Sequence, residues 1–173
     1  KNGSYQDGDV YFKSKTSLNS DQAQAATKLL NSNEYNNLRE FITCMEFNDY
    51  TVNLEYVSST NRIVLPYQKD ALIVLNIRDR NDNNYGKYLD HSHIETLMTY
   101  YHCSEHLVKN YANDIEDFNA HLNSINEMSD IEGFVIRIRN GETVKVKTAW
   151  YVALHRAKDS INSPRRLFEV VVN

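Results

Sequence analysis

The dipeptide Asn140-Gly141 constrains the fold of this 173-residue chain more than any other sequence feature. It stands between two runs, 133–139 and 142–148, that are rich in apolar and β-branched residues. Asn-Gly favours a two-residue turn in which both central residues have positive φ, and such a turn joins antiparallel strands. We therefore expect a β-hairpin over residues 133–148.

The expected turn also sets the register of the hairpin, because a two-residue turn places Ile136 opposite Lys145 and Phe134 opposite Lys147. Side chains alternate between faces along a strand, so Glu132, Lys145 and Lys147 should share one face. Lysines two residues apart lie ~7 Å apart along a strand and can hold oxygens of one phosphate. An exposed face with cross-strand ion pairs, worth ~0–1 kcal/mol, explains the same spacing, and spacing alone favours it.

The rest of the chain alternates between helix and strand patterns. After turn signals at Asn2-Gly3 and Asp7-Gly8-Asp9, we expect a strand over 10–15, helices over 21–30 and 35–47, strands over 51–57, 61–67 and 71–78, a helix-prone stretch over 91–128, and a short helix and tail over 150–170. The strand over 71–78 is nearly all apolar, as a strand buried on both faces would be. These elements predict one α+β domain over 1–173, built on an antiparallel sheet.

The two N-terminal helices have the clearest signals. Ser20 precedes the run DQAQAATKLL, where a serine can cap the helix and Asp21 lies in the first turn, as the helix dipole favours. In the following segment the apolar residues recur at helical spacing: Leu38, Phe41, Ile42 and Met45. We therefore expect both segments to be helical.

Composition places the chain among soluble globular proteins. The net charge is −4, so any basic surface that binds nucleic acid must be local. Two cysteines, Cys44 and Cys103, are too few for a disulfide scaffold and lack metal-ligand spacing, which favours a reduced, cytoplasmic setting. No stretch approaches roughly 18 apolar residues, so we expect no membrane association.

Outside the hairpin the candidate residues are less distinctive. Glu55 lies in the middle of NLEYV, where strand propensity disfavours a carboxylate, and a solvent-exposed face is the simplest explanation. Lys13 and Lys15 repeat the two-residue lysine spacing, although each alone is typical of a solvated charge. His102 and His106 could bind a metal from one helix face, but scattered polar positions are the favoured interpretation.

Four strings occur in an order shared with one family: FKSKTS, NLEYVSSTNRIVLPYQ, EGFVIRI and VKVKTAWYVALH. They closely resemble the adenylyltransferase domain of the T-even bacteriophage RNA ligase 1 family, from about Tyr5 to Val172. Long strings such as WYVALH are far more specific than a lone motif. The resemblance implies an antiparallel-sheet nucleotidyltransferase core, ATP-grasp-like as in other ligases, with peripheral helices.

The resemblance also implies an activity. Members of the family use ATP and Mg²⁺ to join a 5′-phosphate RNA end to a 3′-hydroxyl end. They act through a lysyl-AMP intermediate and then an adenylylated RNA end. A nicked tRNA is the implied substrate, in RNA repair, and the protein would act as a monomer in the cytoplasm, which is the host's if a phage encodes it.

The match implies roles for individual residues in nucleotide binding. Lys145 and Lys147 would contact the α-phosphate, and Glu55 would contact the nucleotide at its ribose. Glu132 would contact the metal or the nucleotide. These four residues fall in the third, fourth and fifth motifs of the family.

Further roles follow from the same match. Lys15 matches an essential lysine of the family, and Tyr151 matches an essential tyrosine just after the fifth motif. Leu75 and Val135 match an apolar pair that encloses adenine, although a two-residue turn would put Val135 on the opposite face from Lys145. The ligands of the metal stay unassigned.

The N-terminal segment departs from the family pattern. The family's nucleophile lies in a motif K-x-D/N-G-S, whereas Lys1-Asn2-Gly3-Ser4 lacks one residue and lies too close to the Asp-Gly-Asp turn. We interpret Lys1-Asn2-Gly3 as a turn and expect a chain cut at both ends, with the nucleophile upstream and an acidic metal pair downstream. The alternatives are a module that only binds nucleotide or RNA ends, and a structural domain with solvated lysines.

Overall fold

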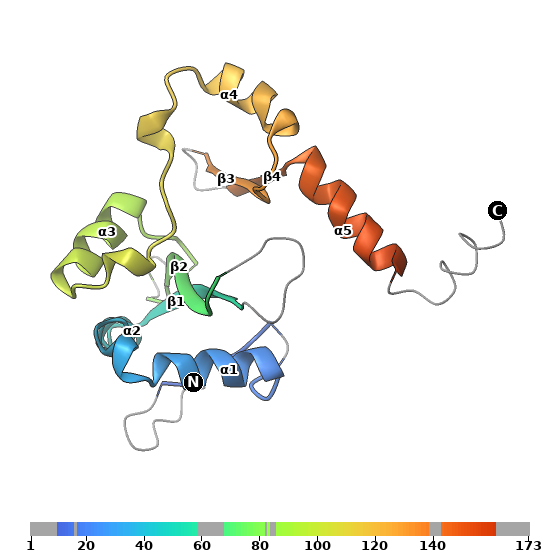
Figure 1. The fold of residues 1–173 in the computed structure, drawn as a ribbon. Coiled ribbons are helices and arrows are strands. Elements are labelled where there is room, and N and C mark those ends of the chain that lie inside the picture. The colour runs from blue at the N-terminus through green and yellow to red at the C-terminus, as the bar shows by residue number, and fades with distance from the viewer. Residues whose placement is uncertain are drawn as a thin grey trace. The chain divides into compact units, whose positions relative to one another are not determined.

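The computed structural model divides into two compact units (Figure 1). The first unit comprises residues 1–58 and 69–110, and the second comprises residues 59–68 and 111–173. The residues whose structure is described are 10–15, 17–58, 68–81, 83, 86–138 and 143–161, except for the side chains of 113 and 158–161. These residues form five α-helices and two two-stranded antiparallel sheets, which confirms the predicted α+β class.

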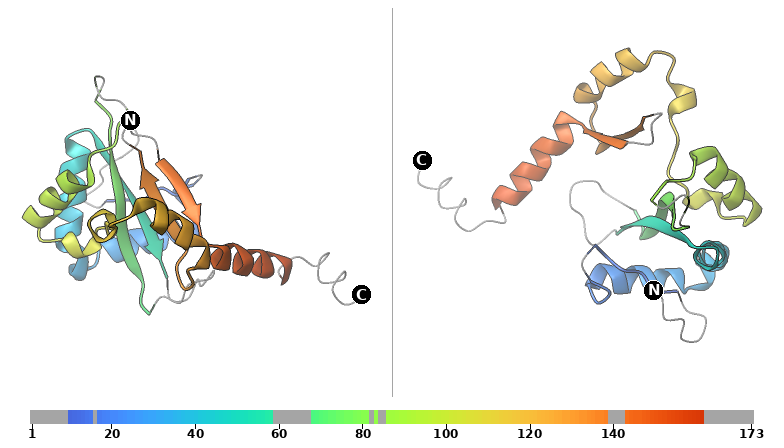
Figure 2. Two further views of the ribbon diagram at one scale, coloured as in Figure 1. Left: turned by 90° about the horizontal axis from the view of Figure 1, so that it is seen from above. Right: turned by 180° about the vertical axis from the view of Figure 1, so that it is seen from behind.

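The first unit is a two-stranded sheet packed against helices. Strands β1 (Tyr50–Val57) and β2 (Ala71–Asp79) are antiparallel and lie side by side in Figures 1 and 2. Five helical segments accompany them: α1 (Asp21–Leu30), η1 (Asn33–Tyr35), α2 (Asn36–Phe47), α3 (His91–Tyr100) and η2 (Ser104–His106). The core between helices and sheet includes Leu30, Leu38, Phe41, Leu72, Val74, Ile77, Ile94 and Met98.

Local signals explain the first two helices, and both predictions are confirmed. The Ser20 hydroxyl oxygen accepts a hydrogen bond from the amide of Ala23, 3.2 Å away, and α1 has the predicted bounds. Capping of this kind satisfies one of the amides that a helix start leaves unpaired. Helix α2 begins one residue later than predicted and buries the four apolar residues that recur at helical spacing: Leu38, Phe41, Ile42 and Met45.

A β-bulge in β2 determines which side chains leave the core. Leu54 pairs with Val74, but Asn53, the residue before it on β1, pairs with Asn76. Leu75 is therefore the extra residue. A bulge of this kind shifts the alternation of the strand by one residue. Leu75 and Asn76 therefore both follow the face that points away from the core.

Strand β2 is buried on one face, so the prediction of burial on both faces is wrong. Leu72, Val74 and Ile77 are buried in the core, whereas Ile73 and Leu75 are only half-buried. The reason is that the helices of the first unit cover one side of this sheet. The apolar side chains of Ile73 and Leu75 are left on the other side.

The predicted strand over 10–15 is also wrong, because this segment has no strand partner among the described residues. Its backbone bonds to side chains of α1 and its C-cap instead. The amide of Phe12 donates to the Thr27 hydroxyl at 3.0 Å, and the Asn31 amide group donates to the Val10 carbonyl at 3.4 Å. Val10 and Phe12 still pack against the core, which accounts for the alternating pattern.

The second unit carries the predicted hairpin. Its described elements are η3 (Ala112–Asp114), α4 (Phe118–Ser124), η4 (Ile125–Glu127), β3 (Gly133–Arg137), β4 (Thr143–Lys147) and α5 (Ala149–Ile161). Strands β3 and β4 are antiparallel, and α5 follows β4 after one residue. The predicted strand over 61–67 and the turns at 2–3, 7–9 and 140–141 lie outside the described residues.

The predicted register of the hairpin is wrong by one residue. Phe134 pairs with Val146 and Val135 with Lys145, and the last pair joins Arg137 to Thr143. In the predicted register Phe134 would pair with Lys147 and Ile136 with Lys145, whereas each of them pairs with the residue one position earlier on β4. A shift of one residue in register moves the side chains of one strand to the other face relative to its partner, so the observed pairs determine which side chains share a face.

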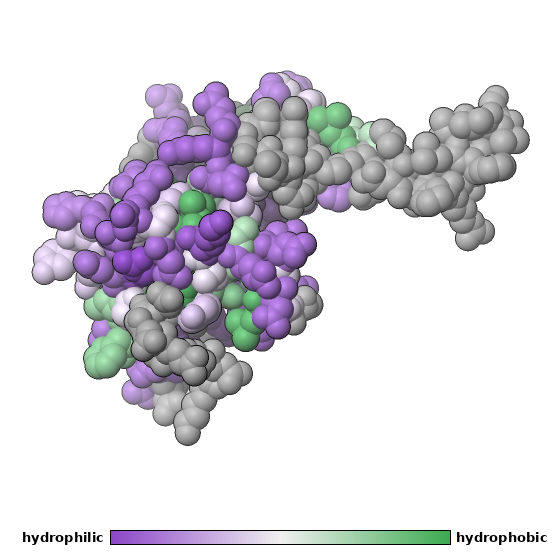
Figure 3. Space-filling model, turned by 60° about the horizontal axis from the view of Figure 1, so that its bottom comes forward, coloured by the Kyte–Doolittle hydropathy of each residue, from purple (hydrophilic) through white to green (hydrophobic). Residues whose placement is uncertain are grey.

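The coloured part of the face seen in Figure 3 is predominantly polar. In the view of Figure 3, hydrophilic side chains cover most of the coloured surface, and hydrophobic ones occur in small separate areas. The described helices include none that is both long and apolar enough to cross a membrane.

Candidate nucleotide-binding site

One face of the β3–β4 hairpin combines two lysines with an exposed apolar side chain. Val135 pairs directly with Lys145, and directly paired residues place their side chains on the same face. Lys147, two residues further along β4, shares this face. The expectation that Val135 and Lys145 lie on different faces of the hairpin is therefore wrong, because it followed from the wrong register. With 66% of its surface exposed, Val135 offers an apolar contact beside the lysines.

Glu132 lies immediately before β3 and contacts both lysines. Its carboxylate oxygen Oε1 is 2.7 Å from the Lys145 Nζ and 3.2 Å from the Lys147 Nζ. The structure thus brings together the three charged residues that the sequence grouped, although the register of the hairpin differs from the predicted one. A single carboxylate between two ammonium groups leaves this cluster of three residues with a net charge of about +1.

Gly133 explains how Glu132 reaches the lysines despite the changed register. Its φ of +151° is one that L side chains rarely adopt, so the strand alternation breaks between Glu132 and Phe134. The backbones are also unusually close here. A Cβ atom on Gly133 would clash with the Val146 carbonyl oxygen and lie 2.7 Å from the Lys147 Cα.

The lysines determine the ionisation of Glu132. Partial burial of the carboxyl group raises its pKa, but hydrogen bonds and charge attraction from Lys145 and Lys147 together outweigh burial and leave the pKa below its ordinary value. The Glu132 side chain is 27% exposed, so solvent screens this interaction only in part. At neutral pH the group is a carboxylate that fixes the positions of two cations.

Tyr151 extends the site from the first turn of α5. The Lys147 Nζ lies 4.8 Å from the centre of the Tyr151 ring, within the range of a cation–π interaction. Tyr151 is 8% exposed, and its ring also lies 6.0 Å from that of His155 on the next turn. Lys147 therefore has a carboxylate on one side and an aromatic ring on another.

Thr148 joins these parts, and the sequence analysis missed it. It is fully buried between β4 and α5. Its backbone amide donates to the Glu132 carbonyl at 3.0 Å, and its hydroxyl accepts from the Tyr151 amide at 3.1 Å. The signal was available, since a threonine directly before the helix-forming run Ala149–Leu154 is a typical N-cap.

The opposite face of the hairpin is covered in part, around Phe134, while Val144 on the same face is 46% exposed. Phe134, which alternates with Val135, packs edge-on against the rings of Tyr111 and His121 at 5.4 and 4.9 Å between centres. His121 belongs to α4, so this helix covers the face of Phe134. The lysine face and the apolar face of the hairpin are therefore distinct.

In the first unit, Glu55 lies on the face of the sheet that points away from the core. Glu55 is exposed and pairs with Ile73, and Leu75 follows on the same face. The exposed position agrees with the solvent-exposed interpretation of Glu55. It also places a carboxylate beside two half-buried apolar side chains.

The same face continues into a polar hollow of about 200 Å³. Its lining consists of Thr51, Asn53, Arg78, Asp79, Arg80 and Tyr88. Asn53 lies two residues from Glu55 on β1, and its amide group donates to the side-chain oxygen of Asn76 at 2.6 Å. The face of β1 and β2 that carries Glu55 is thus polar toward its far end.

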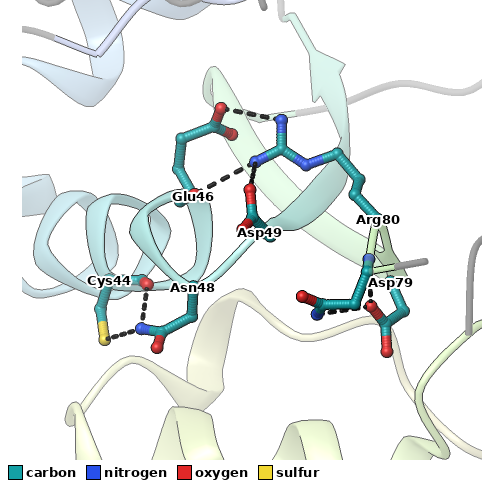
Figure 4. A network of polar contacts seen from close by, with 7 residues as sticks. Cys44, Glu46, Asn48, Asp49, Asp79 and Arg80 are labelled. Atoms are coloured by element: carbon teal, nitrogen blue, oxygen red, sulfur yellow. Dashed lines mark hydrogen bonds and ion pairs between the residues drawn. The ribbon is translucent and has the colours of Figure 1, made fainter. Parts of the chain in front are cut away.

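Arg80 anchors one wall of this hollow to the end of α2 (Figure 4). Its guanidinium donates to the Glu46 carboxylate and to the Glu46 carbonyl, each at 3.1 Å, and lies 3.9 Å from the Asp49 carboxylate. Asp49 has a φ of +61°, so the chain turns sharply between α2 and β1. The network fixes the end of β2 against the helix.

Lys13 and Lys15 lie exposed in the segment before α1. Ser14, which lies between the two lysines, bonds twice to the Ser17 carbonyl. Its hydroxyl donates at 2.8 Å and its amide donates at 2.9 Å. Lys15 thus belongs to the first unit with Glu55 and Leu75. The remaining candidates, Glu132, Val135, Lys145, Lys147 and Tyr151, belong to the second.

The histidine pair does not form the helical arrangement that a metal site would need. Helix α3 ends at Tyr100, His102 lies beyond it with a φ of +53°, and His106 belongs to η2. The ring of His106 lies 4.8 Å from that of Tyr35. Among the described residues no three histidine, cysteine, aspartate or glutamate side chains gather to hold a metal ion.

Comparison with known families agrees with this geometry. A family model described as RNA ligase, of the T4 RNA ligase 1 type, matches residues 3–151. The match covers most of the chain, so the chain belongs to the T4 RNA ligase 1 family. It includes both faces described above, the one with Glu55 and the one with Glu132 and the two lysines, and ends at Tyr151.

The close approach at Gly133 gives a test of the hairpin. Gly133→Ala should destabilise the second unit by roughly 1–3 kcal/mol, because the new Cβ clashes with the Val146 carbonyl at an unfavourable φ. Val135→Ala, on the same strand but exposed, should change the free energy of unfolding by less than about 0.5 kcal/mol. Urea denaturation followed by fluorescence of Trp150 measures both, and equal midpoints would contradict the described backbone.

The depressed pKa of Glu132 gives a second test. The carboxylate stabilises the fold fully above its ordinary pKa of 4.5, and this contribution is lost as the pH falls through the lower folded-state pKa. The difference in free energy of unfolding between the wild type and Glu132→Gln should therefore be constant near neutral pH and shrink below that value. Urea denaturation from about pH 7 to about pH 3.5 measures it. A difference that grows toward acid pH would refute the ion-pair geometry.

Proposed function

We propose that this protein is an ATP-dependent RNA ligase that seals 5′-phosphate and 3′-hydroxyl RNA ends through lysyl-AMP and RNA-adenylate intermediates. The observation that carries the proposal is the contact of Glu132 with Lys145 and Lys147 on an exposed hairpin face. Transfer reactions at phosphorus depend on positioning and on fixed cations near the developing charge. Membership of an RNA ligase family supports RNA as the substrate.

Lys145 and Lys147 are the proposed ligands of the α-phosphate. In the first step a lysine amine attacks the α-phosphorus, a phosphorus–nitrogen bond forms, the bond to the β-phosphate oxygen breaks, and pyrophosphate leaves. Negative charge grows on the phosphate oxygens, and two nearby ammonium groups stabilise it. No lysine of this sequence is assigned as the nucleophile, because Lys1-Asn2-Gly3-Ser4 lacks the spacing of the family motif.

Glu132 is the proposed organiser of this pair. Its carboxylate holds both ammonium groups in place before the nucleotide binds, which reduces the reorganisation needed during the reaction. A single carboxylate also fits Mg²⁺, which commonly keeps several waters and binds phosphate oxygens with one or two carboxylates. When bound, the ion would neutralise phosphate charge and orient the leaving group.

The remaining candidates fit the other parts of the nucleotide. Val135, beside the lysines, is the proposed apolar contact of adenine on the hairpin face, and Leu75 keeps its adenine role only as the resemblance implies it. The Glu55 carboxylate can accept hydrogen bonds from ribose hydroxyls. Lys15 would add a further cation, and Tyr151 would orient Lys147 through its ring.

The biological setting is proposed from the resemblance in the four sequence strings. A nicked tRNA is the proposed substrate, in RNA repair, and the protein would act as a monomer in the cytoplasm. The net charge of −4 supports a local rather than a general basic footprint for RNA. The second candidate, a module that only binds nucleotide or RNA ends, differs in forming no covalent adduct.

Removal of either lysine tests the phosphate role. In the protein made from the complete reading frame, Lys145→Ala and Lys147→Ala should each slow formation of the protein–AMP adduct by roughly 10²-fold or more, since each removes a charge that stabilises the transition state. Transfer of label from α-³²P-ATP to protein in the presence of Mg²⁺ measures the rate.

Lys69→Ala is the matched control for these variants. Lys69 is also an exposed lysine, 3.7 Å from the Glu34 carboxylate, but it lies in the first unit. Its loss should leave labelling unchanged. Near-normal labelling of the Lys145 and Lys147 variants would refute the phosphate role, and a wild type that binds ATP without labelling would favour the binding module.

A further inference from the structure

Thr148 lies where the end of β4, the residues before β3 and the start of α5 meet. It is fully buried and polar. Its hydroxyl donates to the Ile131 carbonyl at 2.9 Å and accepts from the Tyr151 amide at 3.1 Å. Its backbone amide donates to the Glu132 carbonyl at 3.0 Å. Thr148 thus bonds directly to Ile131 and Glu132, before β3, and to Tyr151, in the first turn of α5.

The three bonds fix the two groups that contact Lys147. On one side, bonds to the Ile131 and Glu132 carbonyls fix the backbone from which the Glu132 carboxylate extends. On the other, the bond to the Tyr151 amide fixes the first turn of α5, from which the Tyr151 ring reaches Lys147. A shift at Thr148 would therefore move the carboxylate and the ring relative to the ammonium group.

The hydroxyl does more than an ordinary helix cap requires. A cap needs only an oxygen that accepts from an amide of the first turn. The Thr148 hydroxyl also donates its proton to Ile131, the residue next to Glu132. Only a side chain that both donates and accepts at this distance can connect the two sides, which serine can do and valine cannot.

We propose that Thr148 is a positioning residue for adenylylation, acting through Glu132 and Tyr151 to set the location of Lys147. This inference rests on the proposed function of the two lysines. It assigns to Thr148 an effect on the rate of the chemical step, beyond its contribution to stability. Small displacements of positioned groups have large effects on rate, of roughly 10²-fold for 1 Å.

The test compares Thr148→Val with Thr148→Ser in the protein made from the complete reading frame. Valine keeps the branched shape and removes the hydroxyl, so single-turnover formation of protein–AMP should slow by roughly tenfold or more while the half-saturating ATP concentration changes by less than about threefold. Serine should restore the rate to within about threefold of the wild type. If the valine variant does not fold, Thr148→Cys replaces it, because a thiol is only a weak donor and acceptor.

A double-mutant cycle separates positioning from stability. In a Tyr151→Ala background the ring that Thr148 places is gone and only the route through Glu132 remains, so adding Thr148→Val should slow labelling by clearly less than the roughly tenfold expected without the Tyr151 change. In a Leu154→Ala background, a change further along α5, the valine effect should keep its full size. A valine variant as fast as the wild type, or an effect undiminished by Tyr151→Ala, would overturn the inference. A wild type that forms no adduct would instead refute the proposed function.

Discussion

The ion-pair cluster of Glu132 with Lys145 and Lys147 is the interaction on which the candidate site depends. Two ammonium groups on one strand face repel each other, and the shared carboxylate at 2.7 and 3.2 Å holds them together. That arrangement requires a backbone at Gly133 that no other residue adopts easily, and a buried Thr148 that joins β4 to α5. The local fold of the second unit therefore serves to place three charges.

The cluster also gives the hairpin face its chemical character. The lysines retain a net positive charge after pairing with Glu132, and the exposed Val135 lies directly opposite Lys145. A face with cations and an adjacent apolar side chain suits a ligand that is anionic at one end and flat and apolar at the other, as a nucleotide is. The first unit has a second face on which a charged side chain adjoins apolar ones, but there the charge is the carboxylate of Glu55, beside Ile73 and Leu75.

Sequence reasoning succeeded where a local interaction decides the structure. The cap at Ser20 and the helical spacing of the apolar residues in α2 determine those helices by themselves. It failed where a distant or backbone-level constraint decides. The hairpin register differs by one residue from the one that Asn140-Gly141 predicts, and the reach of Glu132 depends on the φ of Gly133. The charge pattern of the sequence grouped Glu132 with Lys145 and Lys147, which do contact one another. The backbone conformation at Gly133 explains how they meet.

The most direct test of the central claim observes the lysines while nucleotide binds. NMR of the lysine side-chain ammonium groups, assigned by single Lys→Arg variants, should show saturable shifts of the Lys145 and Lys147 signals on addition of ATP and Mg²⁺. The Lys69 signal should stay unchanged, and adenosine, which lacks phosphate, should shift the two lysines far less. If ATP binds while the signals of Lys145 and Lys147 stay unchanged, the hairpin face is not the phosphate site.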